Sequence, residues 1–117
     1  MTKYGIIGSR MRLDRQSVTD FVNCLPENSV VVSGGCIGID TWAADAAMER
    51  GLAVVVHLPD KSGCTQRWQF TKAFHARNEL IAQDCDVLVA FVSSDRKGGT
   101  EDTIRRAKKH GKEIWIK

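Results

Sequence analysis

The chain has 117 residues, of which 43% are hydrophobic and 26% are charged, and its formal net charge at pH 7 is +3. These values are typical of one soluble globular domain, and they exclude a disordered chain, a collagen-like repeat and a coiled coil. No apolar run reaches the roughly 18–20 residues that a membrane helix needs, and the short apolar start does not fit a signal peptide. We therefore expect a single domain over residues 1–117, a cytoplasmic location and no membrane partner.

Strand-like and helix-like patterns alternate along the whole chain. Apolar, β-branched segments that indicate strands are found at residues 4–8, 29–33, 52–58, 87–92 and 113–116. Helical spacing of apolar residues is found at 14–25, 40–50, 68–83 (in one or two pieces) and 100–110. This alternation predicts an α/β fold, a Rossmann-like three-layer αβα domain with a five-stranded parallel sheet. Right-handed crossovers favour the strand order 3-2-1-4-5.

Three polar, glycine-containing loops follow the first, second and fourth predicted strands. They are residues 8–10 (GSR), 33–40 (SGGCIGID) and 97–100 (KGGT). Glycine lets a ligand approach the backbone closely, and the second and third loops open helices, whose N-termini carry unpaired N–H donors. A ligand of such a sheet binds where the strand order reverses, here between strands 1 and 4. The three loops together predict a site for a phosphate or a nucleotide.

The residues expected to bind this ligand lie in these loops and in the third helix. They are Gly8, Ser9, Arg10, Ser33, Gly34, Gly35, Gly38, Asp40, Arg77, Asn78, Gly98, Gly99 and Thr100. Arg10 is expected to grip a phosphate, because a guanidinium binds phosphate oxygens in pairs. For Asp40 we favour the role of N-cap of its helix, with a ligand contact as the alternative.

Several common sites are absent from the sequence. There is no G-x-G-x-x-G dinucleotide fingerprint and no G-x-x-x-x-G-K-[ST] phosphate loop, so the usual dehydrogenase and NTPase interpretations lose their main support. The histidines are not spaced as metal ligands, and the four cysteines form no C-x-x-C pair. We expect free thiols, no metal and no cofactor.

Two segments resemble a known family. The run 33–40, followed by alanines, resembles the SG-x-x-x-GID-x-x-A segment of the DprA/Smf proteins, and 77–82 resembles their RN-x-x-IA segment. Trp68, Arg77-Asn78 and Gly99-Thr100 are most similar to the small, YspA-like single-domain branch. The resemblance runs from about residue 4 to residue 116. It implies a Rossmann-like domain of the SLOG superfamily that binds a nucleotide or a nucleotide-derived molecule, as a sensor or carrier. It also implies a homo-oligomer.

The resemblance leaves two alternatives open. Some branches hydrolyse the N-glycosidic bond of nucleoside monophosphates (phosphoribohydrolases), with an arginine and the glutamate of a PGG-x-GT-x-x-E motif as catalytic residues. Here Thr103 stands at the glutamate position, and Glu101, two residues earlier, points about 200° away around a helix. If the chain is such an enzyme, Glu101 and Arg77 are the candidate catalytic residues. The other carboxylates nearby are Asp40 and Glu79.

The second alternative is DprA-like binding of single-stranded DNA. The run 105–112 is the one concentrated basic stretch, although cations at the end of a helix usually form only a solvated face. For Trp68 we weigh a place in the core or an interface against stacking on a nucleobase. His75 lies two residues before Arg77 and is a weaker candidate for a contact in the site.

Overall fold

The structure is a computed structural model that describes all 117 residues. The strands are β1 (Lys3–Gly8), β2 (Val30–Ser33), β3 (Ala53–Val56), β4 (Val87–Phe91) and β5 (Glu113–Ile116). The helices are α1 (Arg15–Asn23), α2 (Ile39–Glu49), α3 (Arg67–Asp84) and α4 (Gly99–Lys109). Strands and helices alternate without exception, so every predicted element is present.

The sheet is parallel and has the order β3-β2-β1-β4-β5, which confirms the predicted fold. Gly8 pairs with Phe91 at the ends of β1 and β4, so the loops after these two central strands leave the sheet at the same level. Because β3 and β5 are edge strands, they are half exposed, whereas β2 and β4 are buried throughout. The long apolar strand predicted at 52–58 is therefore shorter and less buried than expected.

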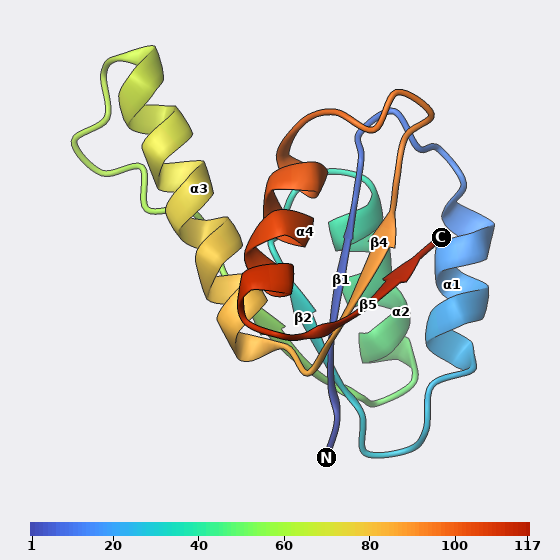
Figure 1. Ribbon diagram of the computed structural model, residues 1–117. Helices are drawn as coiled ribbons and strands as arrows, with labels where there is room; N and C mark the ends of the chain where they lie inside the picture. Colours follow the sequence, from blue (N-terminus) through green and yellow to red (C-terminus); the bar gives the residue numbers. More distant parts are fainter.

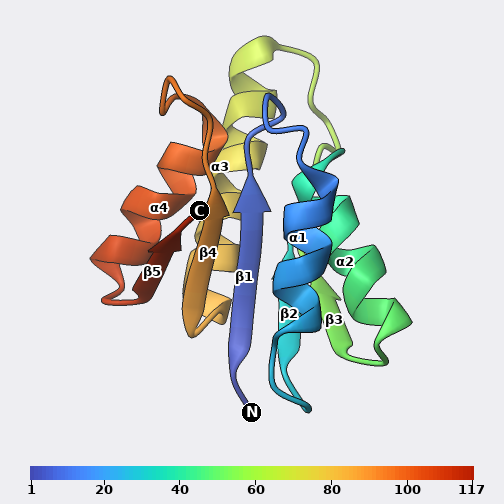
Figure 2. The same ribbon diagram turned by 90° about the vertical axis from the view of Figure 1, so that its right-hand side faces the viewer.

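The sheet lies between two layers of helices, α1 and α2 on one face and α3 and α4 on the other (Figure 2). Side chains of alternate strand residues point to opposite faces of the sheet and belong to two separate hydrophobic clusters. One joins Ile6 and Val89 to Val18 and Ala47 on the α1–α2 face. The other joins neighbouring strand residues to side chains of α3 and α4, among them Ile81. No helix is long and apolar enough to cross a lipid bilayer.

Helix α3 is a single helix of 18 residues with a capping box formed by Gln66 and Gln69. Its buried residues all lie between Arg77 and Ala82, in its C-terminal half. The N-terminal half projects past the carboxyl edge of the sheet and away from the body of the molecule (Figure 1). The helical spacing over 68–83 predicts Phe70, Phe74, Leu80 and Ile81 as inward residues, but Leu80 is 47% exposed. That prediction was wrong because α3 packs on one narrow side only.

Candidate functional site

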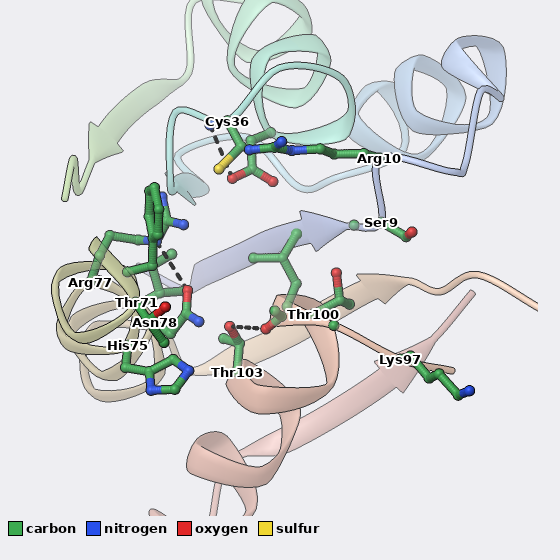
Figure 3. A pocket seen from close by; sticks show the side chains of 17 residues that line it. Ser9, Arg10, Cys36, Thr71, His75, Arg77, Asn78, Lys97, Thr100 and Thr103 are labelled. Carbon is green, nitrogen blue, oxygen red and sulfur yellow. Dashed lines mark hydrogen bonds between the residues drawn. The ribbon is translucent and has the colours of Figure 1, made fainter. Parts of the chain in front are cut away.

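A cavity of about 420 Å³ lies at the carboxyl ends of β1 and β4, where the strand order reverses (Figure 3). Its volume is toward the lower end of the range for small-molecule sites, roughly 300–1,000 Å³. Nine of the thirteen residues predicted from the sequence line it: Gly8, Ser9, Arg10, Asp40, Arg77, Asn78, Gly98, Gly99 and Thr100. The topology therefore brings together most of the loops that the glycine pattern singled out.

The N-terminus of α4 forms one wall of the cavity. Its N-cap is Gly98, which has no side chain to occupy the first turn, and no side-chain cap is present. The first intrahelical bond of this turn runs from the amide of Asp102 to the carbonyl of Gly98. The three preceding amide N–H groups therefore have no helical partner. Because Gly98, Gly99 and Thr100 line the cavity, these donors and the positive end of the helix dipole are available to an anion there.

Arg10 supplies a positive charge at the mouth of the cavity. It follows β1, is exposed, and forms none of the salt bridges within the chain. Its side chain extends over the cavity toward Cys36 (Figure 3). Lys97 is also without a salt bridge, but its amine is turned away from the other labelled side chains (Figure 3). Arg10 is thus the cation best placed to meet an anionic ligand.

Asp40 corrects one sequence prediction. It is the second residue of α2 and not its N-cap, because the chain turns at Gly38 (φ 96°) and the helix begins at Ile39. The carboxylate folds back into the loop before the helix, where Oδ2 accepts a hydrogen bond of 3.4 Å from the amide of Cys36. The nearby backbone amides of Gly34 and Gly8 also act to lower the pKa of this carboxyl. The anion-binding position at the start of α2 is therefore filled by the protein's own carboxylate.

Burial dominates the electrostatics of Asp40. It raises the pKa of this carboxyl to about 6, although the amide of Cys36 and the charge of Arg77 act in the opposite direction. Arg77 faces the same position, since a Cβ on Gly34 would lie 2.8 Å from Asp40 Oδ2 and 2.9 Å from Arg77 Nη1. Asp40 is also the only carboxylate that lines the cavity. Its proton therefore decides whether the cavity holds a negative charge of its own.

The other predicted residues of the second loop do not line the cavity: Ser33, Gly34, Gly35 and Gly38. The hydroxyl of Ser33 donates to the carbonyl of Asp40 at 3.0 Å and accepts from the amide of Gly35 at 3.2 Å. Gly35 is exposed, and a Cβ there would meet Leu58 at 2.6 Å. Gly34, Gly35 and Gly38 thus shape a turn that positions Asp40. The structure does not bring these glycines to the wall of the cavity.

Arg77 and Asn78 link three elements at the floor of the site. Nη1 of Arg77 donates to the carbonyl of Gly34 at 2.6 Å, and Nε donates to Oδ1 of Asn78 at 3.0 Å. Nδ2 of Asn78 donates in turn to Oδ2 of Asp102 at 3.1 Å. Burial disfavours the charged form of Asp102, yet hydrogen bonds from Arg106 and Asn78 outweigh it and lower the pKa. Both predicted residues line the cavity, and both also hold it together.

The other candidate carboxylates point elsewhere. Glu101 forms two hydrogen bonds with Arg96, of 2.9 and 3.0 Å, and does not line the cavity. Glu79 pairs with His110 and Arg106 on the outer side of α3 and α4. The helix geometry predicted this displacement of Glu101, since its side chain lies on another side of α4 than Thr103, which does line the cavity.

The sequence analysis missed several residues of the site. Thr71 and Phe74 of α3, with Thr103 of α4, line the cavity beside His75, which was only a weak candidate. A signal was present in the spacing, because 71, 74, 75 and 78 share one face of a helix. This spacing identifies site residues only once the structure shows that this face of α3 lines the cavity.

Comparison with known proteins supports the fold. No protein-family model matches the chain, and no curated protein sequence matches it. Among solved structures, DNA processing protein A (DprA) from Streptococcus pneumoniae matches 99% of the chain, with a TM-score of 0.80 and 23% identity. The chain has a DprA-like, Rossmann-like fold. It spans 50% of the length of that DprA chain.

A second solved structure shares the architecture more loosely. The C-terminal domain of a hydrogenase from Pyrococcus furiosus matches 98% of the chain and is itself covered over 90%, with a TM-score of 0.51 and 8% identity. At such low identity the likeness extends to the fold alone. Function therefore has to be argued from the site.

Proposed function

We propose that the chain binds a nucleotide or a nucleotide-derived molecule in the cavity at the ends of β1 and β4. The observation that carries this proposal is the convergence of the uncapped N-terminus of α4 and the unpaired Arg10 on one cavity at the reversal of strand order. A nucleotide phosphate carries about −1.5 to −2 charges near pH 7 and accepts several hydrogen bonds. Free amide donors and a guanidinium match both properties.

The phosphate belongs at α4 rather than at α2 in this proposal. Asp40 already occupies the amides before α2, and its charged form would repel a second anion there. The amides of Gly99 and Thr100 have no such competitor, since Glu101 turns to Arg96. The base and sugar would then lie against α3, where Phe74 and His75 line the cavity. A nucleotide or nucleotide-derived ligand is also what the resemblance to the SLOG superfamily and its YspA-like branch implies.

Isothermal titration calorimetry with nucleoside mono-, di- and triphosphates, ADP-ribose and cyclic nucleotides tests the proposal. Arg10→Ala should weaken the best ligand roughly 10- to 100-fold, the loss expected for one charge-assisted hydrogen bond. Lys108→Ala is the matched control, because it removes a positive charge from the exposed end of α4, away from the cavity. Equal affinities of the two variants, or no binding of any ligand, would contradict the proposal.

The second candidate function is an N-glycoside hydrolase, with Asp40 in place of Glu101 as the candidate catalytic carboxylate. Asp40 lines the cavity, and its raised pKa of about 6 suits a group that exchanges a proton near neutral pH. Release of free base from nucleoside monophosphates that is lost in Asp40→Asn but kept in Glu101→Gln would support hydrolysis. Absence of release at high protein concentration would exclude it for these substrates.

A DNA ligand is the third candidate, because the fold is shared with a DNA processing protein. In the basic run of α4, Arg105 and Arg106 are both paired with Asp102, which leaves Lys108 and Lys109 free. Binding of a single-stranded oligonucleotide that falls steeply with salt and is lost in the double variant Lys108→Ala, Lys109→Ala would favour this interpretation.

A further inference from the structure

The projecting half of α3 carries an exposed aromatic side chain next to the cavity. Trp68 is 65% exposed, although a tryptophan is usually well buried. None of the residues 67–76 is buried. The packing of the core therefore does not explain why this half of the helix projects. A shallow depression lined by Gln66, Arg67, Trp68 and Thr71 lies at its tip.

This depression adjoins the cavity at Thr71. Thr71 lines both, and Trp68, Thr71 and His75 share one face of α3 at positions i, i+3 and i+7. At a rise of about 1.5 Å per residue, Trp68 stands about 10 Å along the helix from His75, which lines the cavity. A molecule that filled the cavity and extended along α3 would therefore reach the indole ring next.

The charge of this segment also points to an anionic occupant. Residues 61–78 contain four lysines and arginines and no aspartate or glutamate. Of these, Arg77 is bound to Gly34, whereas Lys61, Arg67 and Lys72 form none of the salt bridges of the chain. Of these free cations, Arg67 lines the depression together with Trp68. A cation beside an exposed aromatic ring is the combination that binds stacked bases and their phosphates.

We infer that the site takes two linked nucleotides, the first in the cavity and the second with its base stacked on Trp68. This inference rests on the proposed function and extends it. The cavity, at about 420 Å³, is near the lower limit for small-molecule sites, so a second nucleotide has to lie outside it, over α3. The phosphate that joins the two nucleotides would pass near Thr71 and the cations of the projecting segment.

Affinity for matched ligands tests the inference. Calorimetry is run with each nucleoside 5′-monophosphate and with the corresponding 5′-phosphorylated dinucleotide. The dinucleotide should bind more tightly, and Trp68→Ala should remove most of that advantage, a loss of roughly 5- to 100-fold. The same substitution should leave the affinity for the mononucleotide unchanged. Trp68→Phe, which keeps an aromatic ring, should retain most of the advantage.

Leu80→Ala serves as the control, because it also removes an exposed apolar side chain from α3 but lies outside the cavity and the depression. Mononucleotide binding with no gain for the dinucleotide, or a gain that survives Trp68→Ala, would overturn the inference and leave the proposed function standing. Failure of every nucleotide to bind would overturn the proposed function itself.

Two further results would also contradict a site for two nucleotides. Affinity that continues to rise with each added nucleotide would indicate a track for a polynucleotide. If Trp68→Ala instead converts a dimer to a monomer in sedimentation experiments and leaves dinucleotide affinity unchanged, a second copy of the chain covers the projecting half of α3.

Discussion

Asn78 on α3 donates a hydrogen bond of 3.1 Å from Nδ2 to Oδ2 of Asp102 on α4. The two residues are 24 positions apart in the chain, and both are buried. Asn78 accepts a hydrogen bond from Arg77 with its other amide atom, so it joins a guanidinium and a carboxylate that do not touch directly. This link connects the wall of the cavity formed by α3 to the N-terminal turn of α4.

Asn78→Ala should therefore destabilise the protein by about 1–3 kcal/mol, the cost of leaving buried polar groups without a partner. Both Arg77 and Asp102 lose a hydrogen bond in this variant. Chemical denaturation measures the change. Gln83→Ala is the control, because Gln83 is exposed on the same helix and hydrogen-bonded to Glu79 at the surface. Equal stabilities of the two variants would show that the link contributes nothing.

Asp40 should make stability depend on pH in a characteristic direction. Its folded-state pKa of about 6 lies above the ordinary value of 3.8, so the folded protein holds this proton more strongly than the unfolded chain does. The stability associated with the protonated form is complete below pH 4 and is lost as the pH rises to about 6. The loss amounts to about 3 kcal/mol, at 1.36 kcal/mol per pKa unit.

Asp40→Asn removes this titration. The stability of the variant relative to the unsubstituted protein should increase between pH 4 and pH 7. Thermal unfolding of both proteins across this range measures the difference. A difference that stays constant with pH would mean that Asp40 titrates at its ordinary pKa.

Asp84 should act in the opposite direction. Hydrogen bonds from Lys3 and His57, each 2.8 Å long, lower the pKa of this carboxyl below its usual 3.8. The stability that this cluster supplies is present above pH 4 and is lost as the pH falls. Asp84→Asn should be less stable than the unsubstituted protein at pH 7, and the difference should shrink below pH 4. Asp20→Asn, at an exposed carboxylate on α1, should show no comparable change.

Much of the fold followed from local patterns in the sequence. The alternation of apolar runs with helical spacing identifies β1 to β5 and α1 to α4, and crossover rules then restrict the strand order. The carboxyl ends of parallel strands meet at one edge, so the sequence alone places the loops at Arg10 and Gly99 together. These inferences depend only on residues that are close together in the sequence and on general rules for connecting strands.

The errors arose where distant parts of the chain decide the outcome. At α2, the turn at Gly38 (φ 96°) starts the helix at Ile39, whose side chain packs so closely on β1 that a Cβ on Gly8 would lie 2.4 Å from it. Asp40 then turns inward and fills the loop that we expected to hold a phosphate. For α3, helical spacing cannot show that its N-terminal half extends beyond the carboxyl ends of the strands, because the position of a helix along the sheet depends on tertiary packing.

Gly99 offers a test of the phosphate position by steric exclusion. A Cβ on this residue would have only Asn78 Nδ2 as a neighbour, at 3.9 Å, so the fold should accept Gly99→Val. The added side chain would stand beside the first amides of α4 and keep a phosphate away from them. Ligand affinity should fall at least tenfold with little change in melting temperature. Unchanged affinity would contradict binding at the start of α4.

The central claim is that the phosphate binds to the amides of α4 and not to those of α2. Titration of ¹⁵N-labelled protein with the best nucleotide, followed by amide chemical shifts, tests it most directly. We predict the largest shifts at Gly99, Thr100 and Glu101, together with Arg10, and small shifts at Cys36 and Gly38. Large shifts at Cys36 and Gly38, with α4 unaffected, would contradict this account.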